Sequence, residues 1–418
     1  MRKRASFAKH SGERGQTIVL VALTIVTLLA MAALAIDVVT LYVAKGEVQR
    51  AADAAALVAA KAFVDSGVTS EPTNTSMQTL AQNLGTAGVN GILPQNKVAG
   101  IAPAVVGTPS FDFTSNPGNP QVTVTLTRTG LPIFFARIWR SAAATVTASA
   151  KAEAYNPSNS QTATGNYIPI APKCVKPLLI PNKDPNNAGA PFVLPTGVVS
   201  AGVVGKQIIL KDACQPGNPN MACAAPLPLD PPANGGQAHF VPALVTPNTA
   251  NLCPSCQGSS NFEQSIECCD FNAYHCGGTV PNGAADTVIT TKQVDNETKD
   301  GAACLINKPS QDQLDPGSNF PTGPQQFIAG SGPLAGQLVS TSHSIASFPI
   351  INTPVPATGQ VTVVGFLQGF IQAVTGGLGN LQITITVLNL AGCGNNPGTG
   401  APITAGSVSP IPVRLIHE

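Results

Sequence analysis

Apolar residues form one long run near the start of the chain. Residues 16–36 carry no charged side chain and are mostly Ile, Val, Leu and Ala. At about 1.5 Å per residue in a helix, such a run matches the roughly 30 Å hydrocarbon core of a bilayer. The pattern therefore predicts a transmembrane helix over residues 16–36.

The helical pattern continues beyond the apolar run. Residues 37–66 contain no proline and a single glycine, Gly46, and Gly67 then provides a helix stop signal. We therefore expect one continuous helix from the membrane into the exported part of the chain.

One side of this helix is a candidate contact surface. Tyr42, Gln49 and Asp53 fall on the same side at helical spacing, and Ala54, Ala55 and Ala56 are small enough to let another backbone approach closely. Two interpretations are open. The surface packs on the chain's own domain, or it contacts a partner subunit.

The flanking charges predict the orientation of the membrane helix. Residues 1–15 hold five basic residues and one acidic residue, whereas the rest of the chain has more acidic than basic residues. By the positive-inside rule, the N-terminal tail stays in the cytoplasm and everything after residue 36 lies outside. The alternative is a signal peptide cleaved after the A-x-A sequence Ala33–Ala35, which would release the protein.

The first 60 residues also carry a specific motif. Its parts are Arg14-Gly15, Asp37, Tyr42, Val48-Gln49 and the alanine-rich block from Ala51 to Ala60. This pattern resembles the N-terminal module of TadG-like Flp pilus-assembly proteins. The resemblance implies an envelope component of the bacterial inner membrane that assists pilus assembly and contacts other assembly or secretion proteins.

One residue separates this chain from processed pilins. Pilins cut by prepilin peptidase usually carry Glu five residues after the scissile glycine, and Leu20 stands five residues after Gly15. We therefore expect an assembly component rather than a subunit of the pilus shaft.

The next segment alternates between strand and helix patterns. Residues 121–128 and 145–153 alternate as half-buried strands do, and residues 98–113 are apolar and strand-like. Short helices are expected over residues 77–84 and 133–140, with Ser76 capping the first of them and Gly85 ending it. A long helix packed on a small sheet predicts a pilin-like α+β domain over residues 37–155.

A polar linker, residues 156–165, leads into a cysteine-rich region, residues 166–418. Its strand-like stretches are 347–351, 360–371, 381–390 and 411–416, with a glycine-rich break at 376–380. An even number of cysteines in a region predicted to lie outside the cytoplasm indicates disulfides, whose pairing the sequence leaves open. The cysteines are Cys174, Cys214, Cys223, Cys253, Cys256, Cys268, Cys269, Cys276, Cys304 and Cys393.

Redox, zinc and calcium chemistry are three alternatives for this region. Cys253 and Cys256 have the C-x-x-C spacing of redox and zinc sites, and zinc could also recruit Cys268, Cys269, His275 and Cys276. The residues around the C-x-x-C sequence read as loop, which disfavours a redox motif. The oxygen-rich stretch 182–186 resembles part of a calcium loop but lacks the glycine and glutamate of an EF-hand.

The remaining composition excludes several classes of function. The chain has no P-loop, no G-x-S-x-G and no H-E-x-x-H motif, and charged residues make up only 10%. We expect no catalytic site, no cofactor, no metal, no nucleic acid and no small-molecule substrate. The predicted fold class is membrane-anchored α+β. A transmembrane helix continues as a long helix onto a small pilin-like sheet, and a mostly β, disulfide-stapled domain follows. The predicted function is non-enzymatic support of Flp/Tad pilus assembly or secretion. The alternative is a cleaved, secreted or surface-exposed binding or adhesion protein.

Overall fold

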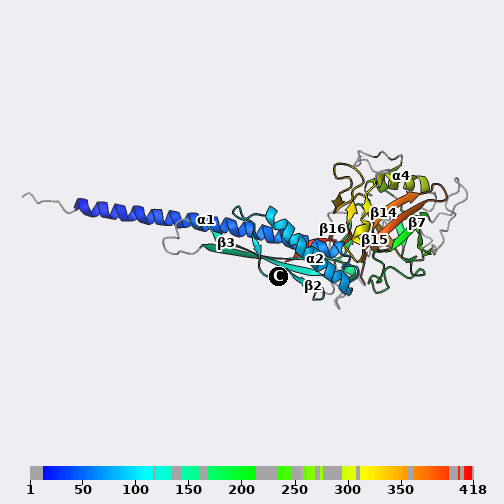
Figure 1. Cartoon of the computed structure of the whole chain (residues 1–418), viewed down its shortest axis with the longest axis horizontal. Helices are drawn as coiled ribbons and strands as arrows, with labels where there is room; N and C mark the ends of the chain where they lie inside the picture. Colours follow the sequence, from blue (N-terminus) through cyan, green and yellow to red (C-terminus); the bar gives the residue numbers. More distant parts are fainter. Residues whose placement is uncertain are drawn as a thin grey trace, which may run out of the picture. The chain divides into compact units, whose positions relative to one another are not determined.

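A single long helix begins the computed structural model. Helix α1 spans Glu13–Asp65, 53 residues or about 80 Å, and is blue in Figure 1. The predicted continuous helix is therefore confirmed. The structure describes residues 13–115, 119–133, 143–159, 168–212, 233–243, 245, 256, 258, 260–268, 274–275, 294–306, 311–354, 361–394, 403–404 and 409–416.

The chain divides into two compact units, and each is assembled from three separate stretches. The first unit comprises Met1–Ala55, Asn90–Pro109 and Val124–Ala150, and the second comprises Ala56–Val89, Ser110–Thr123 and Lys151–Glu418. Helix α1 and the two longest strands of the small sheet contribute residues to both units. These units differ from the contiguous domains 37–155 and 166–418 expected from the sequence.

The second helix is longer than the sequence suggested. Helix α2 spans Thr75–Ile92, followed by a 3-10 turn at Leu93–Gln95, whereas we expected a helix only over residues 77–84. Its first turn is capped by Asn74 rather than Ser76, because the Asn74 side-chain oxygen accepts hydrogen bonds from the Ser76 and Met77 amides. Gly85 continues the helix instead of ending it. A Cβ there would lie 2.8 Å from the Phe111 ring, so this glycine permits close packing.

The small sheet contains five strands. Its strand order is β1-β3-β4-β17, and β2 also pairs with β3. Strands β1 and β2 pair with β3 in the antiparallel direction, and so does β17 with β4. The bounds are β1 Ala104–Val105, β2 Ser110–Asp112, β3 Gln121–Leu131, β4 Ala144–Ala154 and β17 Val413–Ile416. The predicted strands over 121–128 and 145–153 are confirmed. The stretch 98–113 forms two very short strands, because Gly107 and Pro109 interrupt it.

Seven strands form a larger, barrel-like sheet in the second unit. Its order is β6-β13-β14-β15-β7-β9-β8, and β9 also pairs with β6, so six of the strands close on themselves. Figure 1 shows β14 beside β15, the longest antiparallel pair. The bounds are β6 Leu178–Pro181, β7 Gln207–Asp212, β8 Ala233–Asn234, β9 Gln237–Pro242, β13 Ile345–Ile351, β14 Val363–Thr375 and β15 Gln382–Gly392.

Alternate residues of these strands fill the interior. Ile383, Ile385 and Val387 of β15 belong to one buried apolar cluster together with Phe348 of β13 and Phe240 of β9. This period of two is what a closed sheet with a packed interior requires. The predicted strands 347–351, 360–371 and 381–390 therefore supply the main core of the second unit.

Smaller elements pack against this sheet. A three-stranded sheet, β10 to β12, brings Phe327 against Phe370 of β14, with ring centroids 5.0 Å apart. Helices α3 and α4 pack on each other where Gly301 allows close approach to Ile266. The remaining bounds are β5 Ile170–Ala171, β10 Gln313–Leu314, β11 Phe327–Ile328, β12 Leu338–Val339, β16 Ile403–Thr404, α3 Asn261–Glu267, α4 Asp295–Leu305, and the 3-10 turns Pro157–Asn159 and Pro316–Ser318.

Three sequence expectations meet different outcomes at the boundaries of the small sheet. The expected helix over 133–140 lies almost entirely outside the described residues. The expected strand 411–416 forms β17, but it pairs with residues 151–154 of β4 rather than with the barrel-like sheet. Asn156, expected to begin a polar linker, is fully buried. The chain therefore returns to the small sheet after completing the barrel-like sheet.

Candidate functional site

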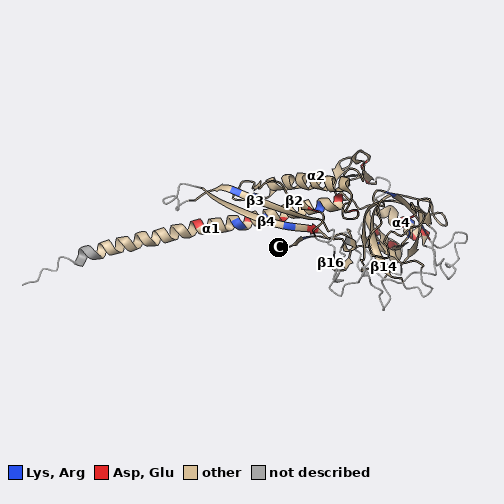
Figure 2. Cartoon of the chain, turned by 90° about the horizontal axis from the view of Figure 1, so that it is seen from below, with Lys and Arg blue, Asp and Glu red and all other residues tan. Residues whose placement is uncertain are grey.

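The first part of α1 presents apolar side chains to the outside of the molecule. Between Ile18 and Val43 its large aliphatic side chains are 49–71% exposed, except for the half-buried Leu41. A core helix of a soluble protein would bury them, and exposure to water costs about 25 cal/mol for each Å² of apolar surface. Figure 2 shows no charged residue in the described beginning of this helix. It is long and apolar enough to cross a membrane.

Two family-motif residues behave differently within this stretch. Asp37 is 3% exposed, so other residues of the chain cover its side of the helix. Tyr42 is 81% exposed, and an exposed aromatic ring with a hydroxyl is typical of the membrane–water interface. The exposed apolar surface from Ile18 to Val43 would span about 39 Å, more than the expected run over 16–36.

Two other motif residues fasten α1 to the small sheet in the first unit. The Gln49 side-chain amide donates to Asp53 Oδ1 at 2.9 Å and to the Ser149 carbonyl of β4 at 3.1 Å. Lys45 donates to the Thr147 carbonyl of the same strand. These contacts satisfy two backbone acceptors of β4, so Gln49 and Asp53 have a structural role within the chain.

The alanine block serves mainly the chain's own packing. Ala55 and Ala56 are completely buried, as are Ala51, Ala52, Ala59 and Ala60. Ala54 and Asp53 remain half-buried. The interpretation in which these small residues pack on the chain's own domain therefore accounts for Ala55 and Ala56, whereas Ala54 still has an accessible side.

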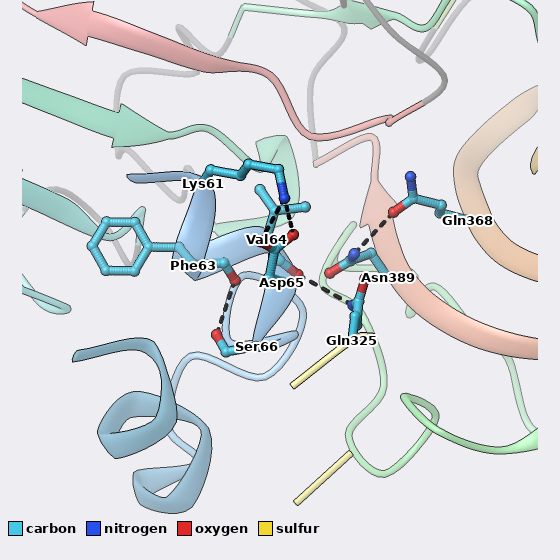
Figure 3. Close-up of polar contacts among 8 residues, drawn as sticks. All are labelled: Lys61, Phe63, Val64, Asp65, Ser66, Gln325, Gln368 and Asn389. Carbon is cyan, nitrogen blue, oxygen red and sulfur yellow. Dashed lines mark hydrogen bonds and ion pairs between the residues drawn. The ribbon is translucent and has the colours of Figure 1, made fainter. Parts of the chain in front are cut away.

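The end of α1 is held against the barrel-like sheet by a buried polar network. Figure 3 shows the part of it formed by Gln325 with Val64 and by Asn389 with Gln368. Gly67 has a positive φ of 76° and its amide donates to the Val64 carbonyl, which ends the helix as the sequence predicts. Beyond it, the Leu390 amide of β15 donates to Ser70 Oγ at 2.8 Å. The side-chain amide of Asn156 donates to the backbone carbonyls of both Thr69 and Leu390 at 2.9 Å.

These bonds cover an edge that the sheet leaves open. Strand β7 pairs with β15 only as far as Thr386, so residues 388–390 of β15 need other partners along that side. The register between β14 and β15 shifts after Gln368, which leaves Leu388 without a directly paired residue. The Gln325 side chain donates to the Leu388 carbonyl at 3.2 Å and to the Val64 carbonyl of α1 at 3.3 Å.

A cleft of about 800 Å³ lies beside this network. Its wall from α1 includes Lys61 and Asp65, whose Nζ and Oδ1 atoms are 2.7 Å apart (Figure 3). Burial raises the pKa of Asp65 above its ordinary value, and the charge of Lys61 partly offsets that effect. The cleft is lined by Leu57, Val58, Lys61, Val64, Asp65, Gln325, Phe327, Ser340, Thr341, Ser342, Ile345, Gln368, Ile403, Ser409, Ile411, Pro412, Val413 and Arg414.

The cysteine-rich region contains a disulfide between Cys256 and Cys304, which ties the segment before α3 to α4. Cys174, Cys268 and Cys393 are also disulfide-bonded. Cys214, Cys223, Cys253, Cys269 and Cys276 lie outside the described residues. Because Cys256 bonds to Cys304, the C-x-x-C spacing with Cys253 does not form the disulfide of a redox motif.

One cluster has the composition of a metal site. Cys256, Cys304 and Glu267 place possible ligand atoms within 4.8 Å of one another. The two sulfurs are joined to each other, so neither is a thiolate ligand in this state. Burial raises the pKa of Glu267, and nearby Glu263 and Asp300 raise it further.

The oxygen-rich stretch 182–186 is a turn built on its own backbone. Asp184 Oδ1 accepts from the Asn186 amide at 2.8 Å, and Asn182 Oδ1 accepts from the Val193 amide at 2.8 Å. The bond between Asp184 and Asn186 is that of an Asx-type turn, whereas the bond from Val193 joins Asn182 to the backbone 11 residues later.

Sequence reasoning missed the residues that join α1 to the barrel-like sheet. Ser70, Asn156, Gln325 and Asn389 belong to no recognisable motif, and their partners are as many as 320 positions away. No local spacing could have identified them.

Comparison with known proteins identifies the N-terminal part of the chain. Residues 15–62 match the family described as putative Flp pilus-assembly TadE/G-like, in agreement with the resemblance found in the sequence. This match supports a role in Flp/Tad pilus assembly. No curated protein and no solved structure matches the chain.

Proposed function

We propose that this protein is a non-enzymatic component of Flp/Tad pilus assembly, anchored in the bacterial inner membrane by the first part of α1. The observation that carries the proposal is the extent of the family match along α1. The family match over residues 15–62 covers both the exposed apolar helix and the segment that folds onto the small sheet.

The charge distribution supports one orientation in the membrane. The basic residues before Gly15 favour a cytoplasmic N-terminus, and the disulfide Cys256–Cys304 fits an oxidising compartment for the barrel-bearing part. Tyr42 would then lie at the outer interface. A helix with about 39 Å of exposed apolar surface would tilt in a core of roughly 30 Å.

The chemistry of the cleft supports a binding or structural role rather than catalysis. Lys61 is paired with Asp65, and Arg414 is paired with Glu153 at 2.7 Å. An acid or base engaged in an ion pair that holds the fold is poorly placed to exchange protons with a substrate. A long helix fastened to a small antiparallel sheet by Lys45 and Gln49 supports the proposed pilin-like arrangement of the first unit.

A replacement experiment tests the anchor and the assembly role together. In cells lacking the protein, pilus production is measured after complementation with the full chain, and the matched variants change only residues 16–36. One variant replaces them with an unrelated leucine-rich span and the other with a cleavable signal peptide. The proposal expects pili with the full chain and the unrelated span, and none with the released form. Normal pili without the protein would overturn the assembly role.

A different pattern would favour the alternative function. If the released form restores pili as well as the full chain does, membrane attachment is dispensable. The protein would then act as a secreted or surface-exposed disulfide-rich binding protein, as the A-x-A sequence at Ala33–Ala35 would allow.

A further inference from the structure

Three possible metal ligands meet at the disulfide of the second unit. The sulfurs of Cys256 and Cys304 and a carboxylate oxygen of Glu267 all lie within 4.8 Å of one another. Glu267 is buried, whereas both cysteines are half-buried and therefore accessible from solvent. Two thiolates and a carboxylate are a ligand set that zinc accepts, but a disulfide supplies no thiolate. The cluster can therefore hold a metal ion only when the disulfide is reduced.

Contacts other than the disulfide hold Cys256 beside Glu267. The Gly258 amide donates to Glu267 Oε2 at 3.0 Å, and the Gln264 side-chain amide donates to the Gly258 carbonyl at 2.9 Å. These two bonds tie the segment that follows Cys256 to α3, which carries Glu267. We therefore expect Cys256 to stay beside Glu267 after reduction.

Helix α4, which carries Cys304, is fixed to α3 by apolar packing. Ile266 of α3 and Leu305 of α4 belong to the buried apolar cluster of the barrel-like sheet. Gly301 lets the two helices approach closely, because a Cβ there would lie 3.0 Å from the Ile266 Cβ. Reduction removes none of these contacts, so Cys304 also stays beside Glu267.

The spacing of the three ligand atoms suits a tetrahedral zinc ion. Thiolate sulfurs about 2.3 Å from such an ion lie about 3.8 Å apart, and a ligating carboxylate oxygen lies slightly closer to each sulfur. The Cα atoms of Cys256 and Cys304 are 6.3 Å apart, so rotation about the Cα–Cβ bonds can separate the reduced sulfurs to this distance. Water would fill the fourth position.

The surroundings of Glu267 favour a cation. Burial desolvates its carboxylate, and Glu263 and Asp300 place further negative charge nearby. A bound divalent cation would compensate both effects. The Gly258 amide would orient the carboxylate at the same time, as hydrogen bonds to metal-ligating carboxylates commonly do.

We propose that the reduced form of this chain binds one zinc ion through Cys256, Cys304 and Glu267. This form precedes the disulfide during synthesis, and a dithiol restores it. In that reaction the S–S bond breaks and takes up two electrons and two protons from the dithiol, which becomes a disulfide. Zinc then displaces the two thiol protons. The zinc ion and the disulfide exclude each other, and neither depends on the proposed membrane anchor.

The test uses the full-length chain in detergent micelles, reduced with dithiothreitol that is then removed in the absence of oxygen. Short pulses of iodoacetamide are given with and without zinc sulfate, and mass spectrometry measures the alkylation of each cysteine. Zinc should slow the alkylation of Cys256 and Cys304 by about tenfold or more, because a free thiolate is the reacting species. The half-buried Cys174 should react at nearly the same rate in both conditions.

A matched pair of variants tests the carboxylate. Glu267→Gln removes the charged ligand, and Glu263→Gln makes the same change one turn earlier on α3, outside the ligand set. Glu267→Gln should raise the zinc concentration that half-protects Cys304 by about tenfold or more, and Glu263→Gln should raise it far less. The alkylation pattern of the wild type does not depend on whether either variant folds.

Several results would overturn the proposal. Equal protection of Cys174 would indicate non-specific binding of zinc to thiols. Protection of Cys253 and Cys256 without Cys304 would indicate a site of different composition. Absence of protection, or equal zinc affinity of the wild type and Glu267→Gln, would exclude this ligand set.

Discussion

Arg414 forms an ion pair with Glu153, whose side chain is almost completely buried between its neighbouring strands. The Arg414 Nη2 and Glu153 Oε1 atoms are 2.7 Å apart, and the two residues are opposite each other in β17 and β4. Gln121 of β3 donates to the other carboxylate oxygen of Glu153 at 3.3 Å. One carboxylate thus links three adjacent strands and fixes the last strand of the chain in the small sheet.

Removing the arginine should therefore destabilise the protein more than removing both charges. Arg414→Met leaves the Glu153 charge buried without its ion-pair partner, and we expect a loss of about 1–3 kcal/mol in the free energy of unfolding. Adding Glu153→Gln to that variant should restore part of the loss. Urea-dependent pulse proteolysis of the detergent-solubilised chain measures both. A double variant as unstable as the sum of the single variants would show that the pair is not coupled.

Asn156 should be the most sensitive single residue of the network at the end of α1. Asn156→Ala leaves the carbonyls of Thr69 and Leu390 without its amide and removes the acceptor for Ser158, all in a buried site. We expect a loss of about 1–3 kcal/mol in stability. The matched control is Asn186→Ala, because the side-chain amide of Asn186 donates to the Gln207 carbonyl at an exposed site. Equal losses in the two variants would contradict the assigned role of Asn156.

The alanine block should separate folding from partner contact. Ala56→Leu places a large side chain at a fully buried position, so we expect it to lower stability by about 1–3 kcal/mol and reduce pilus output through misfolding. Ala54→Leu changes a half-buried position and should leave stability nearly unchanged. If Ala54→Leu and Asp53→Leu give stable, inserted protein but no pili, a partner contacts this side of α1. Normal pilus output from both stable variants would restrict the surface to a structural role.

Two carboxyl groups should change the pH dependence of stability in opposite directions. Burial raises the pKa of Asp65, so the folded state holds that proton more tightly than the unfolded state does, and stability falls as the pH rises above about 3.8. Hydrogen bonding from Ser115 lowers the pKa of Asp112 below its ordinary value of 3.8. The ionised Asp112 carboxylate therefore stabilises the fold above pH 3.8, and this stabilisation is lost as the pH falls below that value.

The measurement is the unfolding free energy of the wild type, Asp65→Asn and Asp112→Asn between pH 3 and about 6. In Asp65→Asn, the free energy of unfolding should decrease less with rising pH than in the wild type. In Asp112→Asn, it should increase less with rising pH than in the wild type. Parallel curves for all three proteins would contradict both assignments.

The sequence predicts elements whose pattern is local. The uninterrupted helix, the stop at Gly67 and the alternating strands follow from the spacing of apolar residues, and the structure contains all of them. The sequence does not predict contacts between segments that are far apart along the chain. Nothing near residues 413–416 indicates that they pair with residues 151–154, and nothing near Asn156 indicates two carbonyl partners in separate segments. The sequence predicts that the second helix ends at Gly85, whereas the helix continues past it, because this glycine serves close packing against Phe111.

The direct test of the proposed anchor is the N-terminal sequence of the mature protein, determined from separated membrane and soluble fractions of the cells that make it. The account predicts a chain that begins near Met1 and is recovered in the inner membrane. A chain that begins at Ile36 in the soluble or surface fraction would contradict the account, because cleavage after Ala35 would have removed the anchor.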